Sequence, residues 1–437
     1  MPKDGGMGRG AAVTANGSED RSFFGHPRGL ATLFFTEMWE RFSYYGIRPL
    51  LVLFMAAALM DGGFGFDRDQ ASAIVGIYAA CVYLASLPGG WIADRLLGLR
   101  RAILWGAVLI SLGHISIGVT AFAGGPLPFF LGLILIVLGT GLLRPNISAI
   151  VGDLYPEGGA RRDAGFSIFY MGINVGAFAG QLITGFLGEM IGWHWGFGAA
   201  GVGMLAGLLV YVLRAKDTLG DIGLEPSRHP DPVVQAKQER LVKLVVGAGL
   251  GILALVIVLA ATGVLTLNAQ AIGQNMTYII VGSAVAYFAY LFLFGGLDGG
   301  EKKRVLVIAV LVFFAAVFWS AFEQAPTSLN LFAADFTDRM VGSFEIPATW
   351  FQSVNSLFII MLAPMFASLW VRLGKRGVDL SSPAKFALGL AFAGVGFALM
   401  IPAANAVVAG GNGTLVAPWW LVGSYFFQTG GELCLSP

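Results

Sequence analysis

Seven charged residues lie inside the long apolar segments of this chain, and they restrict its fold more than any other feature. An ionised side chain at the centre of a bilayer costs about 2.5–3.5 kcal/mol, so seven unpaired charges would cost on the order of 20 kcal/mol. Three are basic and four are acidic, a near balance that indicates partners across a polar interior. Such a set is typical of a transport pathway. The seven residues are Glu37, Glu40, Arg41, Arg48, Arg144, Glu323 and Glu432.

The composition indicates the class of protein. Hydrophobic residues make up 56% of the 437 residues, and charged residues only 12%. A soluble domain carries about 25% charged residues. A water-soluble core could not bury this much apolar surface, so the chain is predicted to be an all-α polytopic membrane protein. The two cysteines, Cys81 and Cys434, lie inside apolar segments and offer no disulfide framework and no metal-ligand spacing.

Twelve apolar runs predict twelve membrane-spanning helices. They cover residues 30–60, 71–95, 102–122, 127–150, 164–188, 194–214, 241–262, 275–296, 305–328, 347–371, 384–404 and 415–437. Residues 1–29 are polar and rich in glycine, and we expect a disordered cytosolic tail and not a signal peptide. The last run reaches Pro437 without a polar exit, so we expect a chain that is truncated relative to a working protein.

The distribution of positive charge predicts the orientation. With a cytosolic N-terminus, 22 of the 27 lysines and arginines fall in the tail and the cytosolic loops, and only Arg68 and Arg339 fall outside. Cytosolic loops carry an excess of basic residues. We therefore expect a multi-pass protein of the plasma (inner) membrane with its N-terminus in the cytosol.

Two segments share a pattern at expected cytosolic turns. GGWIADRLLGLRRAI follows the second span, and WVRLGKRG follows the tenth, with Val371 where the first copy has Asp94. Basic residues cluster in any cytosolic loop, but the first copy is more specific. It resembles the Gly-x-x-x-Asp-Arg-x-x-Gly-x-Arg-Arg loop of the major facilitator superfamily. The residues that carry this resemblance are Gly90, Asp94, Arg95, Gly98, Arg100 and Arg101.

The resemblance implies a major facilitator fold of two six-helix halves. If the second copy follows the second helix of the second half, that half begins at 305, and two spans are left over between the halves. The expected order is a disordered tail at 1–29, a six-helix bundle at 30–214, a cytosolic linker at 215–240, two inserted helices at 241–304 and a C-terminal bundle at 305–437. That bundle would hold four of its six helices.

The first span, which reads FFTEMWERFSYYGIRPL, places its charges on one stripe. At about 100° per residue, five residues fall within an arc of about 100°. They are Glu37, Glu40, Arg41, Tyr44 and Arg48, with Tyr45 at the edge of the arc. Two acids and two arginines on one face of a membrane helix can face only a wet interior. An alternative is a structural pair of Glu37 with Arg41, which would leave Arg48 in need of a partner.

This stripe also carries a closer resemblance. The run Glu-x-x-Glu-Arg-Phe-x-Tyr-Tyr-Gly at 37–46 resembles the signature of the proton-dependent oligopeptide transporter (POT/PTR) family, whose bacterial members carry two extra helices between the halves. Further similar segments are GTGLLRPNISAIVGDLY at 139–155, FSIFYMGINVGAFAG at 166–180, FWSAFEQAPTSLNLFA at 318–333, WFQSVNSLFIIMLAP at 350–364 and GELCLSP at 431–437. The resemblance implies a proton-coupled symporter that imports di- and tripeptides by alternating access.

The resemblance implies roles for most of the buried charges. Proton coupling is implied for Glu37, Glu40, Arg41 and Glu323. Arg48 and Arg144 are implied to hold the C-terminal carboxylate of the peptide, which suits the bidentate guanidinium group. They are also implied to form gate salt bridges, Arg48 with Glu323 and Arg144 with Glu432.

Polar and aromatic residues complete the implied binding site. Glu432 would receive the N-terminal amine of the peptide, helped by Asn174 and Asn355. The other implied binding residues are Arg41, Tyr45, Tyr83, Tyr170, Trp319, Gln324 and Ser436, and Tyr78 is an alternative to Tyr83. The loop formed by Gly90, Asp94, Arg95, Arg100 and Arg101 is expected to act in the conformational change.

No segment resembles a phosphate-binding loop, so no nucleotide is expected to drive this protein. We expect no cofactor, with protons as the coupling ion, and no nucleic acid partner. The expected partners are a small peptide and the lipid bilayer, and the protein is expected to be a monomer. Arg144 stands where the family usually has a lysine, and an arginine effectively cannot lose its proton. Proton coupling at this position is therefore expected to differ from that of its relatives.

Three alternatives remain at this point. A transporter of nitrate or another small anion in the same family would suit the arginines, but Glu432 would repel an anion. A membrane enzyme would need a nucleophile–base pair or a metal cluster, which two cysteines and four scattered histidines do not supply. A channel is the third, but charges paired across two halves favour gates that never open together.

Overall fold

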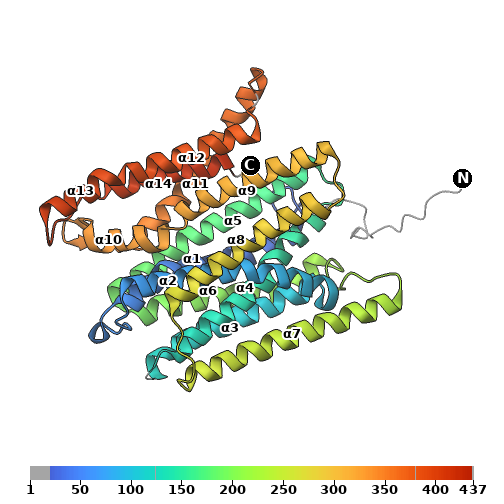
Figure 1. Cartoon of the computed structure of the whole chain (residues 1–437), viewed down its shortest axis with the longest axis horizontal. Coiled ribbons are helices and arrows are strands. Elements are labelled where there is room, and N and C mark those ends of the chain that lie inside the picture. Colours follow the sequence, from blue (N-terminus) through green and yellow to red (C-terminus); the bar gives the residue numbers. More distant parts are fainter. Residues whose placement is uncertain (1–19, 124, 379, 436–437) are drawn as a thin grey trace, which may run out of the picture. The chain divides into compact units, whose positions relative to one another are not determined.

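The computed structural model describes residues 20–123, 125–378 and 380–435, and it is almost entirely helical (Figure 1). The first six long helices are α1 (Arg28–Ala56), α2 (Arg68–Ile92), α3 (Leu99–Ala123), α4 (Leu127–Asp153), α5 (Gly159–Phe186) and α6 (Trp193–Leu219). Next come α7 (Pro232–Ala261) and α8 (Ala269–Phe294). The remainder comprises α9 (Gly299–Phe322), α10 (Asn330–Phe336), the strands β1 (Met340–Val341) and β2 (Phe344–Glu345), α11 (Trp350–Lys375), α12 (Ser382–Ala398), α13 (Met400–Gly410) and α14 (Trp419–Leu435).

Each of the twelve predicted spans coincides with helical structure. The eleventh span is divided between α12 and α13, and the ninth continues beyond α9 through a π-helical turn at Ala325–Leu329 into α10. Two further π-helical turns extend α2 (Ala93–Leu97) and α5 (Leu187–Ile191). Among the described residues, ten helical segments are long and apolar enough to cross a membrane. Helix α1 is not one of them because of its charged stripe, and α14 is described over only 17 residues.

Capping residues place two helix starts outside the apolar runs. Helix α7 begins at Pro232 and not near 241, because the Asp231 side chain accepts a hydrogen bond from the Val233 N–H and proline suits the first helical position. Helix α9 begins at Gly299 with a capping box formed by Asp298 and Glu301. The connection between α6 and α7 is therefore shorter than the predicted linker at 215–240.

The described chain forms two compact units. The first comprises residues up to Glu40, Ala80–Gly176 and Gly201–Leu265, and the second comprises Arg41–Ala79, Ala177–Ala200 and the residues from Thr266 onward. These units follow the density of packing and differ from the predicted division at 214 and 305. The predicted domain boundaries stay a prediction.

Within the first unit, α3 and α4 lie side by side (Figure 1). A Cβ atom added at Gly106 would lie 2.6 Å from the carbonyl oxygen of Gly139, and one added at Gly113 would lie 2.7 Å from that of Gly132. Small residues at such positions let helix backbones approach closely in a membrane, where dispersion contacts drive helix association. This packing fixes α4, the helix that carries Arg144.

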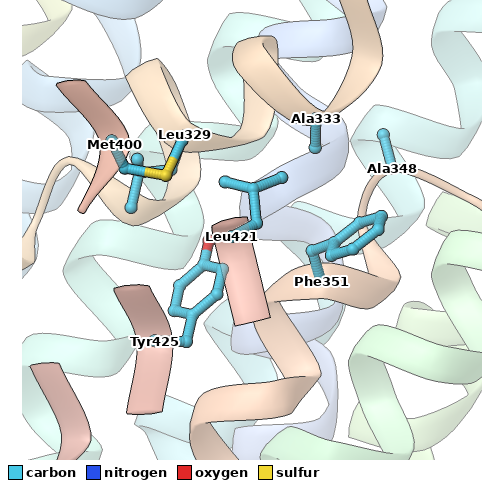
Figure 2. Packing of buried hydrophobic residues seen from close by; sticks show 7 residues of the cluster. All are labelled: Leu329, Ala333, Ala348, Phe351, Met400, Leu421 and Tyr425. Atoms are coloured by element: carbon cyan, nitrogen blue, oxygen red, sulfur yellow. The ribbon is translucent and has the colours of Figure 1, made fainter. Parts of the chain in front are cut away.

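The second unit contains a hydrophobic core that joins the C-terminal helices (Figure 2). It draws on the π-helical turn before α10, on α10 itself, on the segment that leads into α11, and on α11, α13 and α14. The residues are Leu329, Ala333, Ala348, Phe351, Met400, Leu421 and Tyr425. The core holds the start of α11 firmly against α14, and these two helices carry Asn355 and Glu432.

Residues 20–27 belong to the fold and not to the predicted tail. The guanidinium group of Arg161 donates a hydrogen bond to the carbonyl of Asp20, and His26 Nδ1 lies 2.8 Å from the Tyr155 hydroxyl. Burial and the nearby Arg161 charge lower the pKa of His26, and burial raises the pKa of Tyr155 to about 12, so the pair is held neutral. The prediction of disorder to residue 29 is therefore wrong over this stretch. Residues 1–19 lie outside the described part.

Candidate functional site

Helix α1 buries every charge of its predicted stripe. Glu37 is 1% exposed and Glu40 is 0% exposed, and Arg41 and Arg48 are also buried. A lone ionised group in such a place would be very costly, whereas a charge with a partner of opposite sign is tolerated. The sequence makes this possible by spacing acids and arginines three or four residues apart on a helix, where they share one face.

Arg144 of α4 lies beside Glu40 of this stripe. Its Nε atom lies 3.9 Å from Oε1 of Glu40, and both side chains are largely buried. The predicted partner of Arg144 was Glu432, which lies in the other compact unit, so that pair stays a prediction. Sequence reasoning missed Glu40 as a partner, because no spacing rule relates a residue of the fourth span to one of the first.

Arg48 and Glu323 form an ion pair, as the resemblance implied. Glu323 caps the C-terminal end of α9, two residues before the π-helical turn. The guanidinium carbon of Arg48 lies 5.9 Å from the ring centroid of Tyr44, a distance suited to a cation–π contact. Tyr44 in turn stacks on Tyr78, with ring centroids 6.1 Å apart, and meets Tyr45 edge to face. The role of the ion pair as a gate stays a prediction.

These contacts bear on the choice between two tyrosines of α2. Tyr78 is 4% exposed and lies against the stripe through Tyr44, whereas Tyr83 is 54% exposed. The sequence prediction preferred Tyr83. The geometry favours Tyr78 as the tyrosine that lies beside the charged residues of α1.

Glu432 of α14 lies beside Asn355 of α11. The Asn355 amide donates a hydrogen bond of 3.2 Å to Glu432 Oε2 and one of 2.9 Å to the Thr429 hydroxyl. The Thr429 hydroxyl donates to the backbone carbonyl of Tyr425, which fixes its direction. Together these bonds hold a carboxylate at a defined place in the C-terminal helices. A primary amine is a suitable partner for such a carboxylate.

The other predicted binding residues make contacts mainly within their own helix or with their near neighbours in the sequence. Asn174 is buried and donates to the carbonyl of Tyr170 in its own helix, so these two residues lie together on α5. Trp319 is partly exposed and packs edge to face on Phe322, with ring centroids 5.2 Å apart. Gln324 is exposed and accepts a hydrogen bond from Ser328. Ser436 lies outside the described residues.

The predicted conformational loop is a tight turn between α2 and α3. Gly98 has a φ of 78°, and a Cβ atom there would lie 2.5 Å from the Leu224 carbonyl oxygen, so only glycine fits. Gly90 lies in the last turn of α2, and Arg101 is exposed in the first turn of α3.

Partners of this turn come from the connection between α6 and α7. The Ser227 N–H donates to the Asp94 carbonyl at 2.8 Å, and the Arg100 N–H donates to the Gly223 carbonyl at 2.9 Å. Arg95 donates to the Gln238 side chain of α7 at 2.6 Å. The motif did not predict these contacts, because it names neither the backbone carbonyls nor the α7 side chain that take part in them.

The sequence also did not predict the contacts of two acidic residues, Asp335 and Glu189. Asp335 of α10 forms an ion pair with Arg68 at the start of α2. Glu189 lies in the π-helical turn that follows α5 and contacts Arg339 and the start of α11. Glu189 is one residue beyond the predicted span at 164–188, so it is not among the seven charges that the sequence placed inside the apolar segments.

Comparison with known proteins places the chain in a family. The model of the POT family matches residues 100–221 and 277–437. A protein named peptide transporter YePEPT, from Yersinia enterocolitica, is 50% identical over 429 residues, which cover 97% of this chain and 83% of that relative. A di-/tripeptide transporter of Lactococcus lactis is 37% identical over 425 residues, 96% of this chain and 83% of that protein.

Solved structures agree with this assignment. A crystal structure of peptide transporter POT in complex with sulfate matches with a TM-score of 0.85 and 44% identity, covering 96% of this chain and 82% of that one. A POT family transporter in complex with a thioalcohol-conjugated peptide matches with a TM-score of 0.84 and 36% identity, covering 96% and 84%. The expected major facilitator fold is thereby confirmed, and the chain belongs to the POT family.

Proposed function

We propose that this protein is a proton-coupled symporter that imports di- and tripeptides by alternating access. The observation that carries the proposal is the buried stripe of α1, in which acids and arginines lie within one face and Arg48 is paired with Glu323. Relatives that share up to half of the sequence are named as peptide or di-/tripeptide transporters, which supports the substrate class. Their names give no support to the nitrate alternative.

Proton coupling is assigned to Glu37, Glu40, Arg41 and Glu323. A carboxylate in a poorly hydrated place binds a proton more readily, and a neighbouring arginine opposes this. When the carboxylate of a peptide competes for an arginine, the acid partner of that arginine is released to bind a proton. Binding of peptide and proton then favour one another, and no cofactor is required.

Peptide binding is assigned to Arg48, Arg144 and Glu432. Arg48 and Arg144 would hold the peptide carboxylate, and Glu432, held by Asn355, would hold the amine. Glu40 lies 3.9 Å from Arg144, so a bound carboxylate would compete with Glu40 for this guanidinium group. The remaining polar and aromatic residues of the proposed binding site are Asn174, Tyr45, Tyr78 or Tyr83, Tyr170, Trp319, Gln324 and Ser436.

The proposed membrane location and orientation rest on the distribution of basic residues and on the family. We place the protein in the plasma (inner) membrane with a cytosolic N-terminus, since basic residues concentrate in the loops that would then be cytosolic. The protein acts as a monomer and catalyses no chemical reaction. Under this orientation, α5 and α9 end at the outer face, and α11 begins there.

Uptake into proteoliposomes tests the proposal. Purified protein is reconstituted, and entry of a radiolabelled dipeptide is measured with and without an acidic outside pH. We expect the proton gradient to accelerate entry, a protonophore to abolish this acceleration, and unlabelled di- and tripeptides to compete. Uptake that ignores the gradient, or competition by nitrate and not by peptides, would contradict the proposed function.

A further inference from the structure

Glu189 makes an unusual set of contacts for a residue at the end of a membrane helix. Its Oε1 atom accepts hydrogen bonds from the Thr349 N–H at 2.9 Å and from the Thr349 hydroxyl at 2.7 Å. Its Oε2 atom accepts one from the Ala348 N–H at 2.8 Å. The side chain is only 12% exposed. Both carboxylate oxygens thus accept hydrogen bonds from the two residues that directly precede α11.

The position of this carboxylate is electrostatically favourable. Thr349 is the N-cap of α11, whose first backbone N–H groups have no partner within the helix. The helix dipole adds partial positive charge at this end, which favours a carboxylate. Hydrogen bonds to a charged acceptor are about twice as strong as neutral ones. Glu189 therefore fastens the end of α5 to the start of α11.

Arg339, from the segment between α10 and α11, also contacts this carboxylate. Arg339 lies between two acids, with its guanidinium 3.8 Å from Glu189 and 2.6 Å from Glu345. It also donates a hydrogen bond of 2.6 Å to the carbonyl of Ile346. Arg339 thereby ties the β1–β2 hairpin to the same carboxylate. The segment from Arg339 to Thr349 is held by Glu189 at both of its ends.

The packing around Glu189 is tight. The Trp350 indole N–H donates to the Leu182 carbonyl of α5 at 2.9 Å. A Cβ atom added at Gly185 would collide with the Thr349 hydroxyl oxygen, so the Thr349 side chain packs directly on the backbone of α5. Contacts at Leu182, Gly185 and Glu189 thus join this end of α5 to the start of α11. They cannot separate here without breaking the bonds of Glu189.

We propose that Glu189 is an outer gate residue, a carboxylate latch that keeps the outer end of the transporter closed. This inference rests on the proposed function and orientation. Helix α5 belongs to the first six-helix half and α11 to the second, so alternating access must move one against the other. When the outer end opens, water replaces Thr349, Ala348 and Arg339 as partners of the carboxylate. Loss of the latch shifts the population toward the outward-open state.

Labelling of a buried reporter cysteine tests the latch. Ser353 lies one turn into α11, is buried, and donates to the carbonyl of Trp350. A Ser353→Cys change is made in a background with Cys81→Ala and Cys434→Ala. Reaction with a polar maleimide is followed in detergent-solubilised protein, where sidedness plays no part. We expect Glu189→Gln to label about fivefold faster than the parent, because an amide loses the charge and presents donors to donors.

A matched control uses the other acid that contacts Arg339. Glu345 is 51% exposed, so Glu345→Gln removes a charge from the same arginine and leaves the α11 start untouched. We expect its labelling rate to remain within about twofold of the parent, since exposed ion pairs contribute little. Thr349→Val removes one donor and keeps the backbone N–H, and we expect an intermediate rate. This variant decides the question if Glu189→Gln does not fold.

The latch is wrong if Glu189→Gln and Glu345→Gln label at equal rates. If Glu189→Gln is unstable, the latch is wrong when Thr349→Val and the parent label at equal rates. Dipeptide counterflow by the parent protein is measured in parallel. If counterflow is present and the labelling rates are equal, the latch is wrong and the proposed function stands. If the parent shows no counterflow, the proposed function fails, whatever the labelling rates.

Discussion

Helix α1 and the pair α7–α8 meet the same apolar solvent in opposite ways. Helix α1 carries four charges in its middle and buries all of them, whereas α7 and α8 carry no charged residue between Lys243 and Asp298 and leave most of their apolar side chains exposed. Exposure to lipid costs an apolar helix nothing, but a charge requires a partner or water. Charge, and not hydrophobicity, therefore determines which helices can form the interior.

Removing charge from α1 should have the largest effect. We expect Glu37→Gln to reduce uptake driven by an acidic outside pH about 10- to 100-fold, the range of a strong coupling free energy, while counterflow of dipeptide survives. Arg41→Ala should act in the same direction and also destabilise the fold, because it leaves buried acids short of positive charge. Uptake and counterflow are measured in the same proteoliposomes.

Glu157→Gln provides the control for this change. Glu157 lies in the connection between α4 and α5 and forms an exposed ion pair with Arg161 in the first turn of α5, so its loss should leave both activities unchanged. Loss of uptake and counterflow together in a well-folded Glu37→Gln protein would show that coupling and binding are not separable on α1.

Changing the type of charge opposite α1 should have a smaller effect. We expect Arg144→Lys to retain peptide binding but to shift the pH profile of uptake by about one unit or more, because a buried amine can titrate and a guanidinium group cannot. Glu432→Gln should flatten the profile, since it fixes this side chain in its uncharged form. Uptake is measured against pH for both variants. Two unchanged profiles would assign Arg144 and Glu432 a purely structural role.

Adding charge to the inserted pair should have the smallest effect on transport. Val281 of α8 is 56% exposed and lies near the middle of the helix. We expect Val281→Glu to lower the yield in the membrane several-fold, because a lipid-facing charge costs about 2.5–3.5 kcal/mol. Transport per purified molecule should remain within about twofold, and Val281→Leu should change neither quantity. A large loss of turnover by Val281→Glu would show that α8 takes part in the transport cycle.

The sequence predicted the helices well and their ends less well. Apolar runs locate membrane spans because the bilayer demands about 20 apolar residues, but the start of α7 depends on Asp231 and Pro232, which lie outside the run. The burial of the α1 charges followed from helical periodicity. Contacts between distant helices did not, since Glu40 with Arg144 and Glu189 with Thr349 depend on tertiary packing. Only the family resemblance supplied the pair of Arg48 with Glu323.

The α6–α7 connection binds the turn at Gly98 through Gly223 and Ser227, and we call this bound segment the strap. The strap determines where the connection tolerates cleavage or insertion. Gly223 and Ser227 bind the turn through their backbones, whereas the side chain of the next residue, Arg228, is 70% exposed and forms an ion pair with Glu225. Tryptic cleavage after Arg228 would leave the strap attached to the first six helices. Two fragments co-expressed with their junction after Arg228 would keep the backbone bonds of Gly223 and Ser227 within the first fragment, and the Arg95–Gln238 bond would join the two fragments. A fluorescent reporter or an affinity tag is therefore best inserted after Arg228 and not before Ser227.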